Sequence, residues 1–224
     1  MTEAFGFEHF WAQADALIRA DVYLLFAMSL TSWCLIFLKA WTGYRARRVL
    51  ATLDSFWAAR SLDDAVATLR SRDPDALLAP LAIAATGVAR QDGAGPPDWC
   101  TPSERLTRVL RSGIGTAAAR LESGLTLLAS VGATAPFVGL LGTVWGIYHA
   151  LLNIASSGSL SIDKVAGPVG EALIMTALGL GVAIPAVLAY NGFGRANRLL
   201  VAQIDGFALD LHAILSKAAP SAAR

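Results

Sequence analysis

The chain has 224 residues, of which 55% are hydrophobic and only 16% are charged, and its mean hydropathy is positive. This composition is typical of a membrane protein and argues against a soluble globular domain. The net charge of +1 gives no overall field that would attract nucleic acid, so we expect no nucleic-acid partner.

The first apolar segment, Val22 to Leu38, is bounded by Asp21 and Lys39. A bilayer core about 30 Å thick needs about 20 apolar residues to cross. We therefore expect a first transmembrane helix over residues 22–41. Acidic residues precede the segment and no small-residue cleavage site follows it, which favours an uncleaved anchor over a signal peptide.

Residues 42–122 are predicted to form helices rather than a separate globular domain. Asp73-Pro74 is typical of a helix start, with Asp as the N-cap and Pro at the first helical position, and predicts a helix to about Arg90. The glycines and prolines of residues 91–100 predict a turn. The run Thr101-Pro102-Ser103-Glu104 then has the residues of a capping box, and we expect the second span to continue from this helix without a break.

Two further apolar stretches predict two more transmembrane helices. No Asp, Glu, Lys or Arg occurs from Ser123 to Ile162, and Asn153 with the polar run from Ser156 predicts a loop. We expect the second span within residues 123–153, a loop over residues 154–167, and the third span over residues 168–192.

The last segment, residues 193–224, carries apolar side chains at steps of three and four, which predicts an amphipathic helix. Its stripe consists of Phe193, Ala196, Leu200, Ile204, Phe207, Leu211 and Ile214. Such a stripe needs a partner, which we expect among the helices of residues 42–122. The sequence therefore predicts an all-α membrane protein with three transmembrane helices and long helices extending into the cytoplasm.

The distribution of Lys and Arg predicts the orientation of these segments. Residues 1–21 contain one such residue, Arg19, whereas residues 42–122 contain eleven. Because basic residues are retained on the cytoplasmic side, we expect residues 42–122 and 193–224 in the cytoplasm. Residues 1–21 and 154–167 should face outward.

Small residues recur along one face of each of the last two spans. They are Gly132, Ala135, Gly139, Gly142 and Gly146 in the second span, and Ala172, Thr176, Gly179, Ala183 and Ala186 in the third. Helices in lipid associate through close backbone contact, which small side chains permit. We expect tight helix pairs, within or between subunits, with Gly139, Gly142, Gly146 and Gly179 at the contacts.

Glu171 is the one charged residue between Lys164 and Arg195. An acid at this depth is costly when ionised and usually serves a proton, an ion or a partner charge. A local alternative stays open: Gly167-Pro168 could begin the helix and place Glu171 in its first turn, where the helix dipole favours an acid.

Thr143 and Thr176 place hydroxyl groups in the second and third spans. Each could bind a backbone carbonyl, a water molecule or the carboxyl of Glu171. Because five residues correspond to about 140° around an ideal helix, Glu171 and Thr176 need not line one surface.

No pattern in the chain predicts an enzyme, a cofactor or a metal site. The three histidines, His9, His149 and His212, are scattered, and His149 is expected to be an interfacial residue near the outer end of the second span. Cys34 and Cys100 fall in different predicted compartments, which excludes a disulfide between them. A P-loop, a dinucleotide fingerprint and a nucleophile elbow are all missing from the sequence.

Three runs together resemble the MotA/TolQ/ExbB proton channel family in order and spacing: APFVGLLGTVWGI at 135–147, GEALIMTALGL at 170–180 and AIPAV at 183–187. The likeness covers roughly residues 125–195, and the three-span plan extends it across the chain. The run VAGPVGE at 165–171 is most similar to the ExbB branch. Glu171, Thr176 and Thr143 match the polar positions that the family associates with its proton path.

The resemblance implies a homo-oligomer, a pentamer, in the bacterial inner membrane around a pore that holds the transmembrane helices of an ExbD-like partner. It also implies that proton flow energises a TonB-like protein for import across the outer membrane, with iron chelates among the cargo. The outward side would then be the periplasm. A TolQ-like subunit of the Tol-Pal system, a MotA-like stator and a purely structural scaffold are the alternatives.

Overall fold

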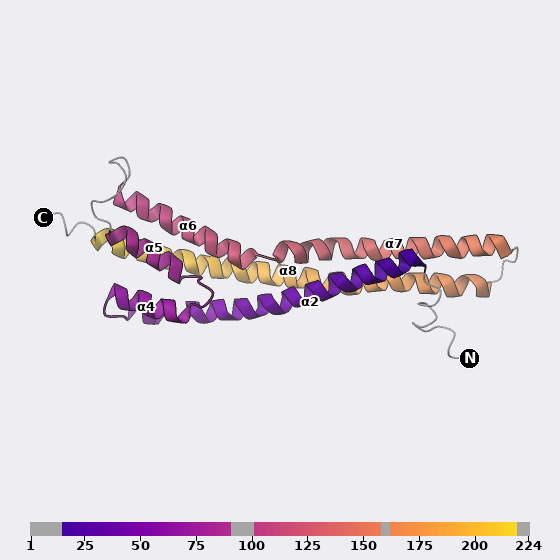
Figure 1. Ribbon diagram of the computed structural model, residues 1–224, viewed down its shortest axis with the longest axis horizontal. Coiled ribbons are helices and arrows are strands. Elements are labelled where there is room, and N and C mark those ends of the chain that lie inside the picture. Colours follow the sequence, from indigo (N-terminus) through magenta and orange to yellow (C-terminus); the bar gives the residue numbers. More distant parts are fainter. Residues whose placement is uncertain (1–14, 91–100, 158–161, 219–224) are drawn as a thin grey trace. The chain divides into compact units, whose positions relative to one another are not determined.

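The structure, a computed structural model, describes residues 15–90, 101–157 and 162–218, except for the side chains at positions 153–154, 156–166, 171 and 218 (Figure 1). Within these ranges the ordered elements are helices, with no strand. They are α2 (Ala16–Leu50), α3 (Leu53–Trp57), α4 (Leu62–Arg72), α5 (Ala79–Arg90), α6 (Pro102–Glu122), α7 (Leu125–Ser157) and α8 (Ile162–Ala218). The all-α prediction is confirmed for this part of the chain.

Three helical segments are long and apolar enough, by length and composition, to cross a membrane: Ala16–Trp57, Pro102–Leu152 and Gly167–Lys217. Each contains one of the predicted spans. The helices are longer than the spans, so their ends do not mark the edges of the bilayer. The assignment of segments to one side of the membrane or the other stays a prediction.

The chain divides into two compact units. Unit 1 consists of Met1–Phe37 and Gly124–Gly192, and unit 2 consists of Leu38–Ser123 and Phe193–Arg224. Unit 1 therefore contains α7 with the first parts of α2 and α8. Unit 2 contains α3 to α6 with the remaining parts of α2 and α8.

Unit 2 is built around a hydrophobic core to which all of its helices contribute. Leu200, Ile204, Phe207 and Leu211 of α8 are buried in this core together with apolar residues from 46 to 121. The ring of Phe207 meets the ring of Phe56 edge to face, with 5.1 Å between the centroids. The predicted partner of the amphipathic stripe is thus confirmed.

One position of that stripe is wrong. Ile214 is exposed, and the neighbouring Leu215 is buried in the core in its place. Leu215 lies four residues after Leu211, which continues the buried face more closely than a step of three would at this point. Phe193 and Ala196, at the start of the stripe, are half-buried.

The helix that was predicted to start at Asp73-Pro74 begins later, at Ala79. Ala76 adopts a left-handed conformation, with φ of 49°, which interrupts the helix before it can start. Asp73 still acts as a cap from a distance. Its carboxylate accepts hydrogen bonds from the backbone N–H groups of Leu77, Leu78 and Ala79 at 2.9, 2.7 and 2.7 Å. The prediction of Asp73 as the capping residue is confirmed, whereas the predicted start of the helix is wrong.

The capping box at the start of α6 is confirmed. The backbone N–H of Thr101 donates to the Glu104 carboxylate at 2.8 Å, and the backbone N–H of Glu104 donates to Thr101 Oγ1 at 3.2 Å. The expected unbroken continuation into the second span is wrong. The helix ends at Glu122, and α7 begins at Leu125 after Gly124, whose φ of 77° is favourable only for glycine.

Side chains from two other helices satisfy the last carbonyls of α6, which have no partner within the helix. Lys39 Nζ of α2 donates to the carbonyl oxygen of Leu121 at 3.0 Å and to Ser123 Oγ at 3.1 Å. Asn197 Nδ2 of α8 donates to the same Leu121 oxygen at 2.6 Å and is buried. These bonds stabilise the break that the sequence did not predict.

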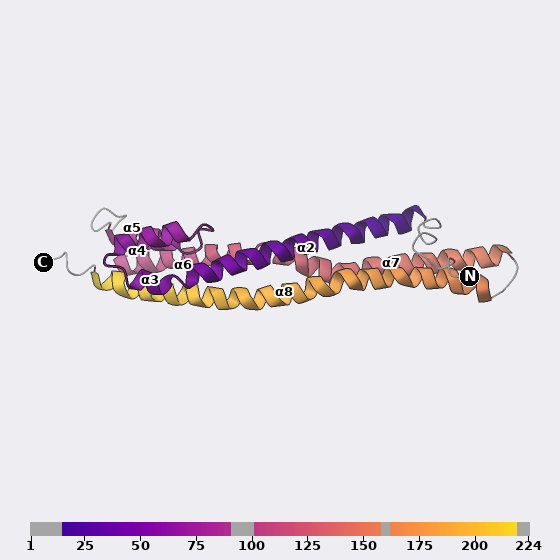
Figure 2. The same ribbon diagram turned by 90° about the horizontal axis from the view of Figure 1, so that it is seen from below.

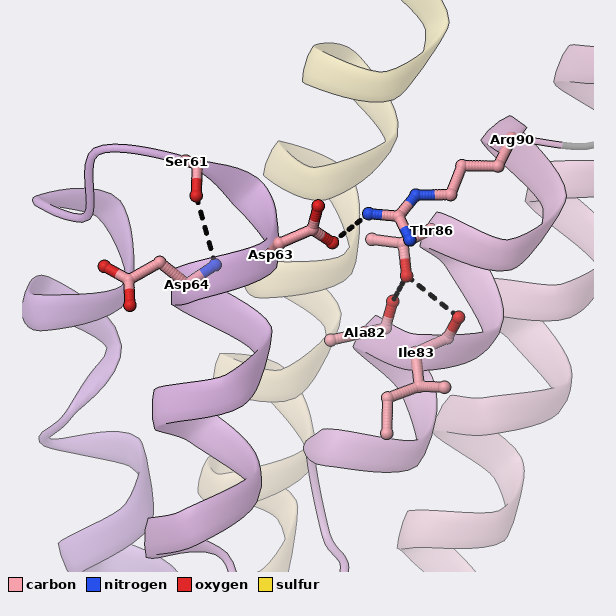
Figure 3. A network of polar contacts seen from close by, with 7 residues as sticks. All are labelled: Ser61, Asp63, Asp64, Ala82, Ile83, Thr86 and Arg90. Atoms are coloured by element: carbon pink, nitrogen blue, oxygen red, sulfur yellow. Dashed lines mark hydrogen bonds and ion pairs between the residues drawn. The ribbon is translucent and has the colours of Figure 1, made fainter.

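Polar contacts join α4 to α5 at the surface of unit 2 (Figure 3). Asp63 of α4 forms an ion pair with Arg90 at the end of α5. Ser61 Oγ caps α4 by accepting from the backbone N–H of Asp64 at 3.2 Å. The Thr86 hydroxyl donates to the carbonyl oxygens of Ala82 and Ile83 in its own helix, and Figure 3 shows no bond from it to α4. The turn predicted for residues 91–100, just after Arg90, lies outside the described residues.

In unit 1, α7 begins at Leu125, within the predicted second span, but continues to Ser157, beyond the predicted start of the loop at residue 154. Helix α8 begins at Ile162, so Gly167 and Pro168 lie inside the helix and do not begin it. A proline removes one backbone donor but is tolerated in membrane helices.

Candidate functional site

Helices α7 and α8 run side by side in unit 1, as Figures 1 and 2 both show. Gly139 lies against Gly179 with almost no space between the backbones. A Cβ atom added at Gly139 would lie 2.5 Å from the carbonyl oxygen of Met175 and 3.1 Å from Gly179 Cα. A Cβ added at Gly179 would lie 2.7 Å from the carbonyl oxygen of Ala135. Only glycine fits at these two positions.

Gly142 and Gly146 continue the same contact. A Cβ at Gly142 would meet the side chain of Met175 at 2.9 Å, and one at Gly146 would meet Ala172 Cβ at 2.9 Å. As α7 advances from Gly139 to Gly146, its neighbours on α8 recede from Gly179 to Ala172, so the helices are antiparallel. The four predicted packing glycines therefore join two helices of one chain.

The two predicted threonines meet in this contact. Thr176 Oγ1 of α8 donates to Thr143 Oγ1 of α7 across 3.4 Å, and Thr143 Oγ1 donates to the carbonyl oxygen of Leu140 at 2.7 Å. Thr143 is only 4% exposed, whereas Thr176 is half-buried. Thr143 thus makes the backbone bond that the sequence left open and also accepts a hydrogen bond from the other helix.

Glu171 is the tenth residue of α8, and its side chain lies outside the described residues. Because the first turn of α8 is residues 162–165, the premise that Gly167-Pro168 places Glu171 in that turn is wrong. Ala172, the next residue, faces Gly146. The backbone of Glu171 therefore lies at the level of Gly146, about 7.5 Å along the helix axis from Thr176.

A histidine–carboxylate pair lies just beyond Gly146, near the end of α7. His149 Nε2 of α7 is 3.4 Å from Asp15 Oδ2, where Asp15 directly precedes α2. His149 Nδ1 is 3.2 Å from the carbonyl oxygen of Trp145. Sequence reasoning missed this pair because nothing in the spacing of residues 15 and 149 predicts that they meet.

Trp145 lies beside this pair. Its indole Nε1 is buried and makes no hydrogen bond within the described part of the chain. Its ring lies 4.8 Å from the His149 ring, centroid to centroid. In the same part of the chain, no group of three or more His, Cys, Asp or Glu side chains could hold a metal ion.

Comparison with known proteins gives consistent matches. The model of the MotA/TolQ/ExbB proton channel family matches residues 81–206. The biopolymer transport protein ExbB of Xanthomonas campestris pv. campestris (strain B100) is 43% identical over 226 residues, covering 92% of this chain and 87% of the relative. ExbB of Neisseria meningitidis serogroup A is 46% identical over 201 residues, covering 88% and 91%. The Tol-Pal system protein TolQ of Pseudomonas aeruginosa is 33% identical over 212 residues, covering 92% and 90%.

Proposed function

The chain belongs to the MotA/TolQ/ExbB proton channel family, and we propose that it is an ExbB-like subunit of a proton channel in the bacterial inner membrane. Its higher identity to the ExbB relatives than to the TolQ relative supports the ExbB branch. In this role it is a transport subunit and not an enzyme.

The observation that carries the proposal is the contact between Thr143 and Thr176. Two hydroxyl groups meet there inside a helix pair whose other close contacts at its glycines involve glycine, alanine, methionine and valine. Polar groups within a membrane are costly and usually mark a path for an ion or a proton. Thr143 and Thr176 can pass or orient water, and Glu171 lies five residues, about one and a half turns, before Thr176 along α8.

Glu171 is proposed as the titrating group of the proton path. A carboxyl in an apolar environment is costly when ionised, and binding a proton removes its charge. A proton that moves through a membrane potential releases about 2.3 kcal/mol per 100 mV. That free energy can drive work only if the path opens and closes with the protonation of a group such as Glu171.

The proposed assembly is a pentamer of this chain around the transmembrane helices of an ExbD-like protein, with a TonB-like protein as the energised partner. Large apolar side chains cover the outward faces of α2, α7 and α8, including Phe26, Phe137 and Leu188. Lipid or further helices must cover such faces. These exposed apolar faces support a membrane assembly.

The proposed topology places residues 1–21 and 154–167 in the periplasm and residues 42–122 and 193–224 in the cytoplasm. Its test is thiol labelling in a variant whose Cys34 and Cys100 are replaced by serine. A cysteine at Ser157 should react with a membrane-impermeant reagent added to whole cells, and one at Gly93 should not. The reverse labelling pattern would contradict the proposed topology.

A TolQ-like role is the second candidate, because a TolQ protein matches most of the chain. Complementation distinguishes the two roles. The chain and its own ExbD-like partner are expressed together in each of two strains. We expect growth on chelated iron to return in a strain that lacks ExbB. We expect no return of detergent resistance in a strain that lacks TolQ. The opposite pair of results would favour the TolQ-like role.

A further inference from the structure

Two hydrogen-bond acceptors face the two ring nitrogens of His149. Nδ1 lies 3.2 Å from the Trp145 carbonyl oxygen, and Nε2 lies 3.4 Å from Asp15 Oδ2. A neutral imidazole has one N–H group and one lone pair. It would therefore leave one nitrogen lone pair facing an oxygen lone pair. A ring protonated on both nitrogens can donate from Nδ1 to the Trp145 carbonyl and carries the positive charge that pairs with the Asp15 carboxylate.

We propose that His149, the Asp15 carboxylate and the Trp145 carbonyl form a proton-binding site that takes up protons at the outer end of the α7–α8 pair. The inference rests on the proposed function and names a further group of the same path. A proton placed on Asp15 would satisfy the same contact with Nε2, so the pair as a whole holds one proton. Imidazole is the side chain that ordinarily changes charge between pH 5 and 8.

The position of His149 along α7 fits this role. Gly146 lies at the level of the Glu171 backbone, and His149 follows it by three residues, about 4.5 Å along the helix axis. Thr143 precedes Gly146 by three residues, at about the same distance in the opposite direction. The order along the pair is thus His149, Glu171, Thr143.

The protein itself does not seal the His149 site. The side chain of His149 is 37% exposed and that of Asp15 is 49% exposed. In the proposed uptake, a proton passes from water at the outer surface to the imidazole, and from the imidazolium back to water on the path toward Glu171. The ring is neutral before and after this exchange, so no other reactant is needed.

The charged and titratable groups around His149 come from three helices. On α2, Arg19 and Asp21 follow Asp15 within two turns. On α7, the Tyr148 ring lies 5.4 Å from the His149 ring, centroid to centroid. On α8, Glu171 lies nearby in the backbone, with Asp163 and Lys164 closer to the helix start and with all three side chains outside the described residues. Among these groups, Asp15 is the one whose charged oxygen lies within 3.4 Å of the ring.

The direct test is a pH titration of the histidine NMR signals of the full chain in lipid nanodiscs, with the signals assigned through His→Gln variants. Asp15→Asn removes the facing charge and keeps the side-chain size. We expect this substitution to change the pH response of the His149 signals, because the imidazolium then loses its charged partner. The matched control, Asp205→Asn at an exposed acid of unit 2, should leave it unchanged. An equal midpoint in wild type and Asp15→Asn would overturn the site.

The functional test is proton flux into liposomes that contain the chain and its ExbD-like partner, measured at outer pH 5 to 8. His149→Gln should remove the imidazole step from the pH profile. The control, His212→Gln, should keep it, because His212 lies in unit 2 and contacts the hydroxyls of Ser103 and Thr107. A His149→Gln profile that superimposes on wild type would overturn the uptake role.

Glu171→Gln separates this inference from the proposed function. If Glu171→Gln abolishes the flux and His149→Gln leaves the profile unchanged, the His149 site fails while the proposed function stands. If Glu171→Gln conducts as wild type does, the proposed function fails. In that case the uptake role falls with it, whereas the NMR titration still decides whether His149 binds a proton with Asp15.

Discussion

The two units of this protein differ in where their large apolar side chains lie. In unit 2, large apolar side chains lie inside, and Leu211 at 0% exposed represents a core drawn from α2 to α6 and α8. In unit 1, many large apolar side chains lie outside, and Phe137 at 70% exposed contrasts with the glycines of the α7–α8 contact, although Leu128 and Met175 are buried.

This contrast indicates two different solvents. Water drives apolar side chains together, so unit 2 gains stability from the area it buries. Lipid is as apolar as leucine, so α7 and α8 gain stability from close backbone contact instead. The same chain therefore uses leucine as a core residue in one unit and as a lipid-facing residue in the other.

The largest expected effect is in the core of unit 2. Leu211→Ala should lower the free energy of unfolding by about 2–5 kcal/mol, because a buried leucine leaves a cavity. The control is Leu209→Ala, two residues earlier on α8 and exposed; it should change stability by about 0.5 kcal/mol or less. Thermal unfolding in mild detergent measures both. Equal losses would mean that α8 presents no distinct core face.

The next effect tests the glycine contact of unit 1. Gly139→Ala should destabilise the protein by about 1–3 kcal/mol, because the added Cβ meets backbone atoms of α8 that cannot give way locally. Gly181→Ala is the control, since a Cβ there meets nothing within 4 Å. It should be neutral or stabilising by up to about 1 kcal/mol, because alanine favours helix. Two variants of equal stability would contradict tight packing between α7 and α8.

A third prediction concerns buried polar groups in unit 2. Asp73→Ala leaves the N–H groups of Leu77, Leu78 and Ala79 without their acceptor. The expected loss is about 1–3 kcal/mol. Asp73→Asn keeps one acceptor oxygen and should lose less. Denaturant unfolding of both variants checks the order, and a stable Asp73→Ala variant would show that water replaces the carboxylate.

The smallest effect belongs to the exposed ion pair of Asp63 and Arg90 in Figure 3. Water screens both groups, so the coupling should be about 0.2–1 kcal/mol and should fall with added salt. A double-mutant cycle with Asp63→Asn and Arg90→Gln measures it. A coupling above 2 kcal/mol that is independent of salt would mean that the pair is shielded in the assembled protein.

Local signals in the sequence predicted the elements of this fold well. Residues three to four positions apart indicate a helix face directly, which gave the core stripe of α8 from Leu200 to Leu211. The capping box at Thr101 and Glu104 is complete within four residues. The glycines of α7 and α8 predicted close contact for the same reason, because their spacing alone places them on one face.

Features that depend on distant residues could not be predicted in the same way. The break between α6 and α7 relies on Lys39 and Asn197, which come from two other helices. The start of α5 depends on a left-handed Ala76, a conformation that alanine rarely adopts. The pair of Asp15 and His149 is a tertiary contact between residues that carry no shared motif. The contact of Thr143 with Thr176 was expected only as two separate polar positions.

The central claim is that the α7–α8 pair carries protons through a titrating Glu171. Its most direct test is proton flux into liposomes that hold the chain with its ExbD-like partner under an imposed membrane potential. We expect Glu171→Gln to assemble as wild type does and to lose the flux, because the amide keeps the size of the side chain but cannot bind and release a proton. Thr143→Val and Thr176→Val should reduce the flux only in part, since water can replace a hydroxyl. Undiminished flux in the assembled Glu171→Gln complex would contradict the claim.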